Sequence, residues 1–481
     1  MNGIWILVIL LGYFALLMLI SAITGKQKEN DSFFTGNRKS PWYVVAIGMI
    51  GTSISGITFV SVPGMVRENG FLYMQTVAGF FFGYILIAQV LLPLYYKLEA
   101  PSIYVYLRDR FGKQAYKTGA WFFLISKAIG SSIRVYVAAL MLQVSLFGSW
   151  HVPFGVTVVS LIFMIWLYTH RGGIKTIVWA DILQSLCMLG ALILIVLQLG
   201  KALGQDTAGI VSTIRSSEYF KLVEWSDWGN KQHFVKQFFS GIFIALVMTG
   251  LDQGMIQKNR SIRKLRDAQK NMYCYGLAFV PVNFIFLSLG TLMYIFAAKE
   301  GIALPAASDE VLPMLATQGY LNTTVTILFM IGIISTAFSS ADTAMASMTT
   351  SFCVDILEKE NDVKTRQRVH FSMAVLFVLI ILIFRAVNST SLIDAIYTIV
   401  SYTYGPLLGM YTFGLFTKRT AKDKFIPRIA VSSPILCYLL QMFTSYCYGY
   451  HFGYELLMLN GLLTFSGLWF TSSKKTTYGN L

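Results

Sequence analysis

Thirteen apolar stretches, each about as long as a lipid bilayer is thick, dominate the sequence. A helix that crosses the hydrocarbon core needs about 20 mostly apolar residues. Only 13% of the 481 residues are charged, whereas soluble domains carry about 25%. We therefore expect an all-α polytopic membrane protein with about 13 transmembrane helices. A cytosolic enzyme, a disordered chain and a secreted disulfide scaffold are excluded. The predicted segments are 3–24, 42–66, 70–97, 114–147, 152–170, 174–204, 235–257, 271–298, 322–357, 368–388, 391–416, 426–446 and 450–472.

The basic residues predict how the chain sits in the membrane. The chain has 38 Lys and Arg against 23 Asp and Glu, and most of the basic residues fall in the loops after odd-numbered segments. Cytoplasmic loops carry the excess of Lys and Arg, so we expect a multi-pass protein of the cell (inner) membrane. Its N-terminus should lie outside and its C-terminus in the cytoplasm. The densest of these loops follows the seventh segment and holds Lys258, Arg260, Arg263, Lys264, Arg266 and Lys270.

Two predicted spans contain a polar, glycine-rich interruption. In the second segment it is the stretch 48–59, and in the seventh it is 249–254. Irregular backbone inside a membrane is tolerated only where it lines a cavity or is buried in protein. Two broken spans at corresponding places in two halves point to the central site of a transporter. The alternative is that small residues only let helices pack closely.

The two breaks lie five segments apart, which fits two five-helix repeats of opposite topology. We therefore expect a single transmembrane transporter domain over residues 1–481. It would consist of a leading helix (3–24), a first repeat (42–204), a second repeat (235–416) and two C-terminal helices (426–472). The outer connection 205–234 predicts an interfacial loop or a short amphipathic helix.

Hydroxyl groups form a stripe along the ninth segment. Thr336, Ser339, Ser340 and Thr343 recur at helical spacing and share one face, with Asp342 beside them. Oxygen ligands of this kind suit a hard cation, so the stripe predicts a sodium site. The alternative is a packing contact between helices.

Five ionisable residues fall well inside the predicted spans: Lys127, Arg134, Asp181, Asp252 and Asp342. Each costs about 2.5–3.5 kcal/mol at a helix centre, so each suggests a site or a partner. Their formal charges sum to one negative charge, which suits a site that gains cations along with an anionic solute. The alternative is that the two basic residues only neutralise the aspartates.

Motifs of soluble enzyme chemistry are missing from the sequence. It has neither a P-loop nor an HExxH pattern, and we expect no enzyme activity. Transport is the first hypothesis. A transporter-fold sensor that detects solute without net transport and a passive channel are the alternatives from other classes.

Several motifs in order resemble one family. They are 172–184 (GGIKTIVWADILQ), 252–257 (DQGMIQ), 335–342 (STAFSSAD) and 404–409 (YGPLLG). Over residues 1–430 the chain is similar to the sodium:solute symporters, which carry sugars, proline, sialic acid, vitamins, iodide and monocarboxylates. The resemblance implies a leucine-transporter-type 5+5 inverted repeat with one extra N-terminal helix.

The resemblance also implies where sodium binds. The ligands would be the carbonyl oxygens of Gly51, Ile54 and Thr336 and the hydroxyls of Ser339 and Ser340. A second sodium site is implied at Asp181, Asp342 and Thr343. Because Asp342 stands where the family has a hydroxyl, its carboxylate either ligates that ion or lets a proton replace it.

The stretch 55–64 is most similar to the subgroup that carries organic anions, including sialic acid. Arg134 falls where sialic-acid carriers place the arginine that pairs with the substrate carboxylate. The resemblance thus implies a sodium-coupled symporter that imports a small organic solute, here an anionic one, by alternating access. A symporter of sugars or other neutral solutes is the alternative. Its partners would be the solute, Na⁺ and the lipid bilayer, with no nucleic acid and no obligate protein partner. The implied solute pocket is lined by Ser53, Ser55, Thr58, Tyr73, Gln75, Arg134, Asp252 and Gln253.

Overall fold

The computed structural model describes residues 3–24, 30–98, 100–387 and 392–473, and nearly all of them are helical. Two short strands, β1 (Thr420–Ala421) and β2 (Ser472–Ser473), pair antiparallel near the end of the chain. The helices are α1 (Gly3–Thr24), α2 (Asn30–Thr35), α3 (Trp42–Ser53), α4 (Gly56–Gly64), α5 (Val66–Asn69), α6 (Tyr73–Leu86), α7 (Leu92–Leu98), α8 (Val105–Arg110), α9 (Lys113–Leu142), α10 (Phe154–Gly172), α11 (Ile174–Ala202), α12 (Thr207–Ser216), α13 (Phe234–Ala245), α14 (Gln253–Arg260), α15 (Leu265–Lys299), α16 (Val311–Thr317), α17 (Thr323–Ser351), α18 (Val363–Val387), α19 (Leu392–Phe416), α20 (Ile426–Tyr448) and α21 (Leu456–Thr471).

Helices occupy each of the thirteen predicted segments. Among the described residues, eight helices are long and apolar enough to cross a membrane, or ten if each of two bent pairs is one span. Two further apolar helices, over Phe154–His170 and Leu456–Thr471, are shorter. The protein is therefore a multi-pass membrane protein, while the count of thirteen spans stays a prediction. The connection 205–234 contains the short helix α12, which agrees with one of the two predictions made for it.

The first break divides α3 from α4, whose axes differ by 60°. Ile54 and Ser55 adopt extended backbone conformations between the two helices. The Ser55 hydroxyl then accepts a hydrogen bond from the backbone N–H of Thr58, and the Thr58 side chain accepts one from the backbone N–H of Ser55. This capping box satisfies two of the backbone donors that a helix start leaves free.

The second break has the same construction. A π-helical turn, η5 (Leu246–Gly250), ends α13, and α14 restarts after Leu251 and Asp252 at an angle of 65°. The Asp252 carboxylate caps α14, with Oδ1 accepting from the backbone N–H of Met255 at 3.0 Å. The Gly-rich interruptions predicted at 48–59 and 249–254 are therefore true breaks.

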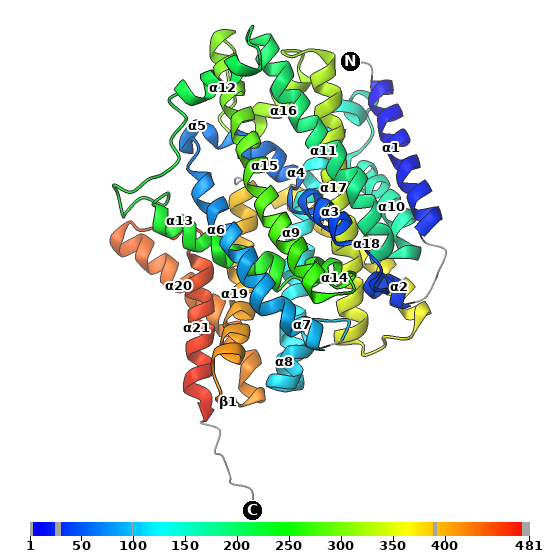
Figure 1. The fold of residues 1–481 in the computed structure, drawn as a ribbon, viewed down its shortest axis with the longest axis vertical. Coiled ribbons are helices and arrows are strands. Elements are labelled where there is room, and N and C mark those ends of the chain that lie inside the picture. Colours follow the sequence, from blue (N-terminus) through cyan, green and yellow to red (C-terminus); the bar gives the residue numbers. More distant parts are fainter. Residues whose placement is uncertain (1–2, 25–29, 99, 388–391, 474–481) are drawn as a thin grey trace, which may run out of the picture.

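Of the two broken spans, α3, α4 and α14 lie in the middle of the bundle, next to α11, α17 or α9, whereas α13 lies at its side against α6 (Figure 1). The helix α1 lies at one edge of the bundle, and α20 and α21 lie at the opposite edge. α1 begins near the end of the molecule that carries α12 and α16, whereas α21 ends near β1 at the other end. The parts of the chain that carry polar breaks are thus the ones surrounded by other helices.

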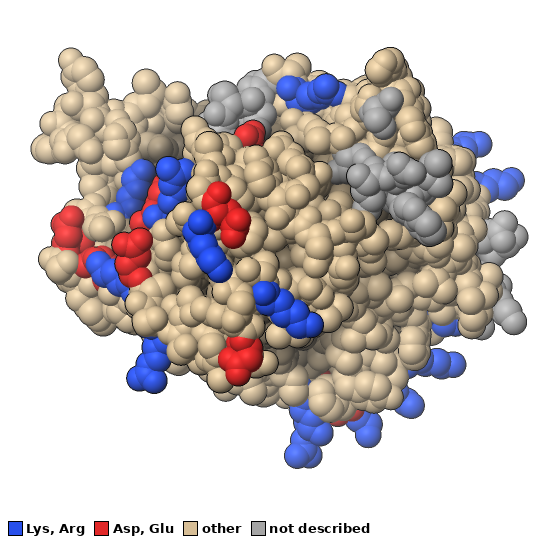
Figure 2. All heavy atoms as spheres, turned by 90° about the horizontal axis from the view of Figure 1, so that it is seen from above, with Lys and Arg blue, Asp and Glu red and all other residues tan. Residues whose placement is uncertain are grey.

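Outward faces of the peripheral helices are apolar. On α20, the side chains of Ile435, Leu439 and Phe443 are exposed, as expected where lipid replaces water as the solvent. Charged side chains gather instead at the ends of the molecule. On the end that Figure 2 shows, basic and acidic groups are interspersed over a largely uncharged surface.

Candidate functional site

A cavity of about 110 Å³ lies where the two breaks face each other. Its walls come from α3, α4, α6, α9, η5, α14, α15, α17 and α19. Both α4 and α14 begin here, and the free N–H groups of a helix start favour negative charge. Of the residues predicted to hold solute, the cavity is lined by Ser53, Ser55, Thr58, Tyr73, Arg134 and Asp252.

The two basic side chains in this cavity differ in whether they form an ion pair. Nζ of Lys127 lies 2.8 Å from Oδ2 of Asp252, and the Tyr404 hydroxyl donates to the same oxygen at 3.0 Å. Asp252 therefore neutralises the charge of Lys127. This agrees with the alternative in which the basic residues inside the spans only neutralise the aspartates. Arg134 forms no hydrogen bond or ion pair within the described residues, and its Nε is buried. One cation of the cavity thus has no direct ion pair among the described residues.

Two predicted solute ligands do not reach the cavity. The amide of Gln75 donates to the carbonyl of Gln232 at 2.9 Å and accepts from the backbone N–H of Glu224. The amide of Gln253 bridges the backbone of Pro101 and Ile103. Both amides are consumed by loop backbone, because buried backbone groups need partners. The expectation that they line the solute pocket is corrected.

A larger hollow adjoins the cavity. This vestibule has a volume of about 1100 Å³ and is lined by parts of α4, α5, α9 and α19 together with the loops around Lys231, Asp309 and His451. Tyr397 lines both spaces, and its hydroxyl lies 3.1 Å from that of Tyr73. These two tyrosines therefore stand at the boundary between the vestibule and the cavity.

Some of the predicted sodium ligands lie at or near the first break. Ile54 lies in the extended link, where its carbonyl is outside any regular helix, and the hydroxyls of Ser339 and Ser340 are buried on α17. Close packing brings these elements together, since a Cβ on Gly56 would lie 3.4 Å from Oγ1 of Thr336. The Ser340 hydroxyl has no hydrogen-bond partner among the described residues and also lines the cavity. An orphaned buried oxygen next to unwound backbone fits a hard cation.

Glycine at position 51 is required by the approach of α3 to α11. Its backbone N–H donates to Oγ of Ser185 at 3.1 Å. A Cβ at Gly51 would lie 2.2 Å from that oxygen and 2.9 Å from the Ser185 Cα. The stretch 48–59 therefore both breaks the helix and lets two helices pack closely, so the two predictions made for its glycines apply together.

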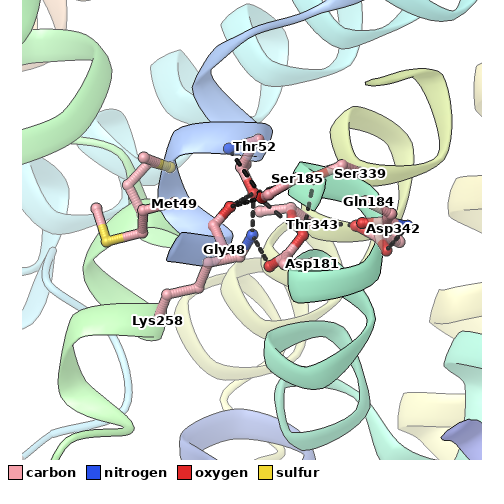
Figure 3. A network of polar contacts seen from close by, with 12 residues as sticks. Gly48, Met49, Thr52, Asp181, Gln184, Ser185, Lys258, Ser339, Asp342 and Thr343 are labelled. Carbon is pink, nitrogen blue, oxygen red and sulfur yellow. Dashed lines mark hydrogen bonds and ion pairs between the residues drawn. The ribbon is translucent and has the colours of Figure 1, made fainter. Parts of the chain in front are cut away.

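Lys258 is the main residue that sequence reasoning misplaced. The basic cluster 258–270 predicts a cytoplasmic loop, but Lys258 belongs to α14 and its side chain is 1% exposed. Its Nζ lies 2.6 Å from Oδ2 of Asp181 and 2.6 Å from Oγ1 of Thr52 (Figure 3). The available signal was its position directly after the stretch 252–257, which keeps it within the restarted half-helix.

Asp181 gathers the neighbouring oxygens around this ammonium. Its Oδ1 accepts hydrogen bonds from Ser339 at 2.8 Å and from Thr52 at 3.1 Å. Asp181, one of the residues predicted for a second sodium site, is thus paired with a cation of the protein itself. The residues from α3, α11, α14 and α17 form one connected network.

Asp342 lies on the other side of that network from Lys258 (Figure 3). Its Oδ2 accepts from the Tyr168 hydroxyl at 2.5 Å and from Gln184 at 3.5 Å, and its Oδ1 accepts from Thr343 at 3.1 Å. Asp342 forms no ion pair within the described residues. Whether Asp342 and Thr343 share an ion with Asp181 stays a prediction.

Comparison with known proteins adds an independent line of evidence. A family model described as the sodium:solute symporter family matches residues 33–424. The chain is 22% identical over 446 residues to the sodium/sialic acid symporter SiaT of Proteus mirabilis, covering 88% of this chain and 87% of that protein. It is 25% identical over 426 residues to the sodium-coupled monocarboxylate transporter 1 of Mus musculus, covering 84% of this chain and 68% of that protein.

A solved structure of the substrate-bound outward-open state of a Na⁺-coupled sialic acid symporter has the same fold. It matches 98% of this chain and 99% of its own chain, with a TM-score of 0.82 at 18% identity. The expected fold class, an all-α polytopic membrane protein of the leucine-transporter type, is confirmed by this likeness.

Proposed function

The chain belongs to the sodium:solute symporter family, and from this premise we propose that it imports a small carboxylated solute, with sialic acid as the first candidate. Family membership makes it a membrane transporter rather than an enzyme, with sodium and a small organic solute as its cargo. The finer proposals are the solute, the direction of transport and the residues that bind each cargo.

Arg134 is the observation that carries the choice of solute. It lines the central cavity without a hydrogen bond or ion pair in the described part of the chain, whereas the neighbouring Lys127 is already paired with Asp252. A guanidinium group binds a carboxylate through two parallel hydrogen bonds. The starts of α4 and α14 add positive ends of helix dipoles to the same cavity. The similarity to the sialic acid symporter of Proteus mirabilis supports the same class of solute.

Sodium would couple to solute through the first break. We propose that the carbonyl oxygens of Gly51, Ile54 and Thr336 and the hydroxyls of Ser339 and Ser340 hold the ion. Ligation would fix α3 and α4 against α17, so that the cavity forms most readily when sodium is bound. Coupling of this kind is typically worth about 1–3 kcal/mol and acts equally in both directions. Loss of sodium to the cytoplasm would then release the solute.

The arrangement in the cell follows from the loop charges. We propose that the chain lies in the cell (inner) membrane with its N-terminus outside and its C-terminus in the cytoplasm. In this orientation the vestibule opens outward, and the cavity lies deeper. The single transporter domain would consist of a leading helix (3–24), two inverted repeats (42–204 and 235–416) and two C-terminal helices (426–472).

Uptake into proteoliposomes tests the proposal. The purified full-length protein should accumulate radiolabelled N-acetylneuraminate under an inward sodium gradient and not in choline buffer. Unlabelled carboxylated sugars should compete better than lactate, and neutral hexoses should not compete. Accumulation of a neutral hexose with no effect of N-acetylneuraminate would favour the neutral-solute alternative. Saturable solute binding without accumulation would favour a sensor.

A further inference from the structure

We propose that the ammonium group of Lys258 is a tethered cation that takes the place of a second sodium ion, so that each carrier binds one sodium ion. This inference rests on the proposed sodium coupling and deepens it, since it fixes the number of ions at the coupling site.

The geometry around Lys258 is that of a bound cation. Its Nζ contacts a carboxylate oxygen of Asp181 and the hydroxyl oxygen of Thr52, each at 2.6 Å. These oxygens belong to α11 and α3, whereas Lys258 belongs to α14. Oxygen atoms from different helices that converge on one positive charge are what a sodium ion would otherwise require.

Burial makes this charge indispensable to Asp181. Both side chains are 1% exposed, and a buried charge is costly unless it is paired and hydrogen-bonded. The remaining oxygen of Asp181 is used by Ser339 and Thr52. A sodium ion at Asp181 would therefore have to displace the buried ammonium.

Charge balance within the spans leads to the same number. Adding Lys258 to the five ionisable residues predicted inside the spans brings their formal sum to zero. Lys258 pairs with Asp181, and Lys127 pairs with Asp252. Arg134 and Asp342 remain without an ion pair in the described part of the chain. One carboxylated solute at Arg134 and one sodium ion on α17, the helix of Asp342, would restore local neutrality.

Sodium alone is the probe that tests this inference. Equilibrium binding of ²²Na⁺ to the purified full-length carrier should give one saturable ion per chain. Lys258→Met removes the ammonium, leaves Asp181 without its counter-charge and should add a second saturable ion. Adding Asp181→Asn to that variant should return the count to one. Lys264→Met is the matched control, because Lys264 is exposed at the start of the next helix, and it should keep one ion.

Two results would overturn the inference: two ions bound per wild-type chain, or a single ion of unchanged affinity in Lys258→Met. The wild-type count decides the matter even if Lys258→Met cannot be purified. Sodium-independent uptake of N-acetylneuraminate would instead overturn the proposed function, so the two failures are distinguishable.

Transport gives a second readout. One sodium ion and one carboxylate carry no net charge, so an inside-negative diffusion potential should not change the wild-type rate of N-acetylneuraminate uptake. In Lys258→Met the second ion only replaces the lost ammonium charge, so the loaded carrier stays neutral and the empty carrier is negative. Each cycle then moves one positive charge inward, and the same potential should raise the rate. Strong stimulation of the wild-type carrier by the potential would contradict a single sodium ion.

Discussion

The hydroxyl groups of Tyr73 and Tyr397 lie 3.1 Å apart, at the boundary between the vestibule and the inner cavity. Tyr73 belongs to α6 and Tyr397 to α19, so this hydrogen bond joins helices that are distant in sequence. Because Tyr397 faces both spaces, movement of either helix would change access to the cavity.

Tyr397→Phe should make the cavity more accessible from the vestibule. One hydrogen bond is worth about 0.5–1.5 kcal/mol, which corresponds to an increase of about 2- to 10-fold in the open population. The measurement is the labelling rate of a cysteine introduced at Thr58, with the exposed Cys274 and Cys447 replaced by serine. Tyr402→Phe is the control, because Tyr402 lies on the same helix and pairs with Gln441 instead. Equal labelling rates in the two variants would refute a barrier at Tyr397.

Ser340→Ala should weaken sodium binding without lowering stability. The Ser340 hydroxyl has no partner among the described residues, so the fold loses no hydrogen bond. Loss of one ligand should raise the half-saturating sodium concentration about tenfold, which corresponds to about 1.4 kcal/mol. The control is Ser335→Ala on the same helix, whose hydroxyl bonds only to carbonyl groups of its own helix. An unchanged sodium dependence in Ser340→Ala would remove Ser340 from the site.

Arg134→Ala should selectively impair the transport of acidic solutes. A charged hydrogen-bonded contact is worth about 1.5–3 kcal/mol, so uptake should fall about 10- to 100-fold. Arg134→Lys should recover only part of the loss, because lysine lacks the planar fork. Lys113→Ala, at the exposed start of α9, should have no effect. If neutral and acidic solutes are impaired equally, Arg134 has a structural role.

Gly51→Ala should destabilise the protein. The added Cβ would lie 2.9 Å from the backbone of Ser185, and helix α3 would have to shift away from α11. Overpacking of this kind costs about 1–3 kcal/mol. Thermal unfolding should therefore begin at a lower temperature than in the wild type. Gly190→Ala on α11 is the control, since nothing lies within 4 Å of its added Cβ. Equal unfolding temperatures would show that the helices can separate freely.

The broken spans could be predicted from sequence because the membrane makes polar backbone expensive. Glycine and hydroxyl residues at 48–59 interrupt an otherwise apolar segment, and the structure bends there by 60°. The cavity residues that the breaks themselves supply, Ser55 and Asp252, follow from this pattern. Each also caps the helix that restarts after it.

The position of Lys258 could not be predicted by the same reasoning. A lysine next to Arg260 and Arg263 has the composition of a loop, and only the path of α14 shows that its side chain turns inward. The prediction that Gln75 and Gln253 line the solute pocket was wrong for a related reason. An amide inside a membrane protein satisfies either solute or loop backbone, and the sequence does not show which loop passes nearby.

Both restarted half-helices begin with a side-chain cap, Ser55 for α4 and Asp252 for α14. Each restarted helix therefore has a backbone N–H group at its first turn that is hydrogen-bonded by its own cap residue. When the two halves tilt against each other, each cap keeps a backbone N–H of the restarted helix paired. Replacing such a cap by an apolar residue would fray the first turn of the restarted helix. Transport would then slow even though every residue that binds solute or sodium is unchanged.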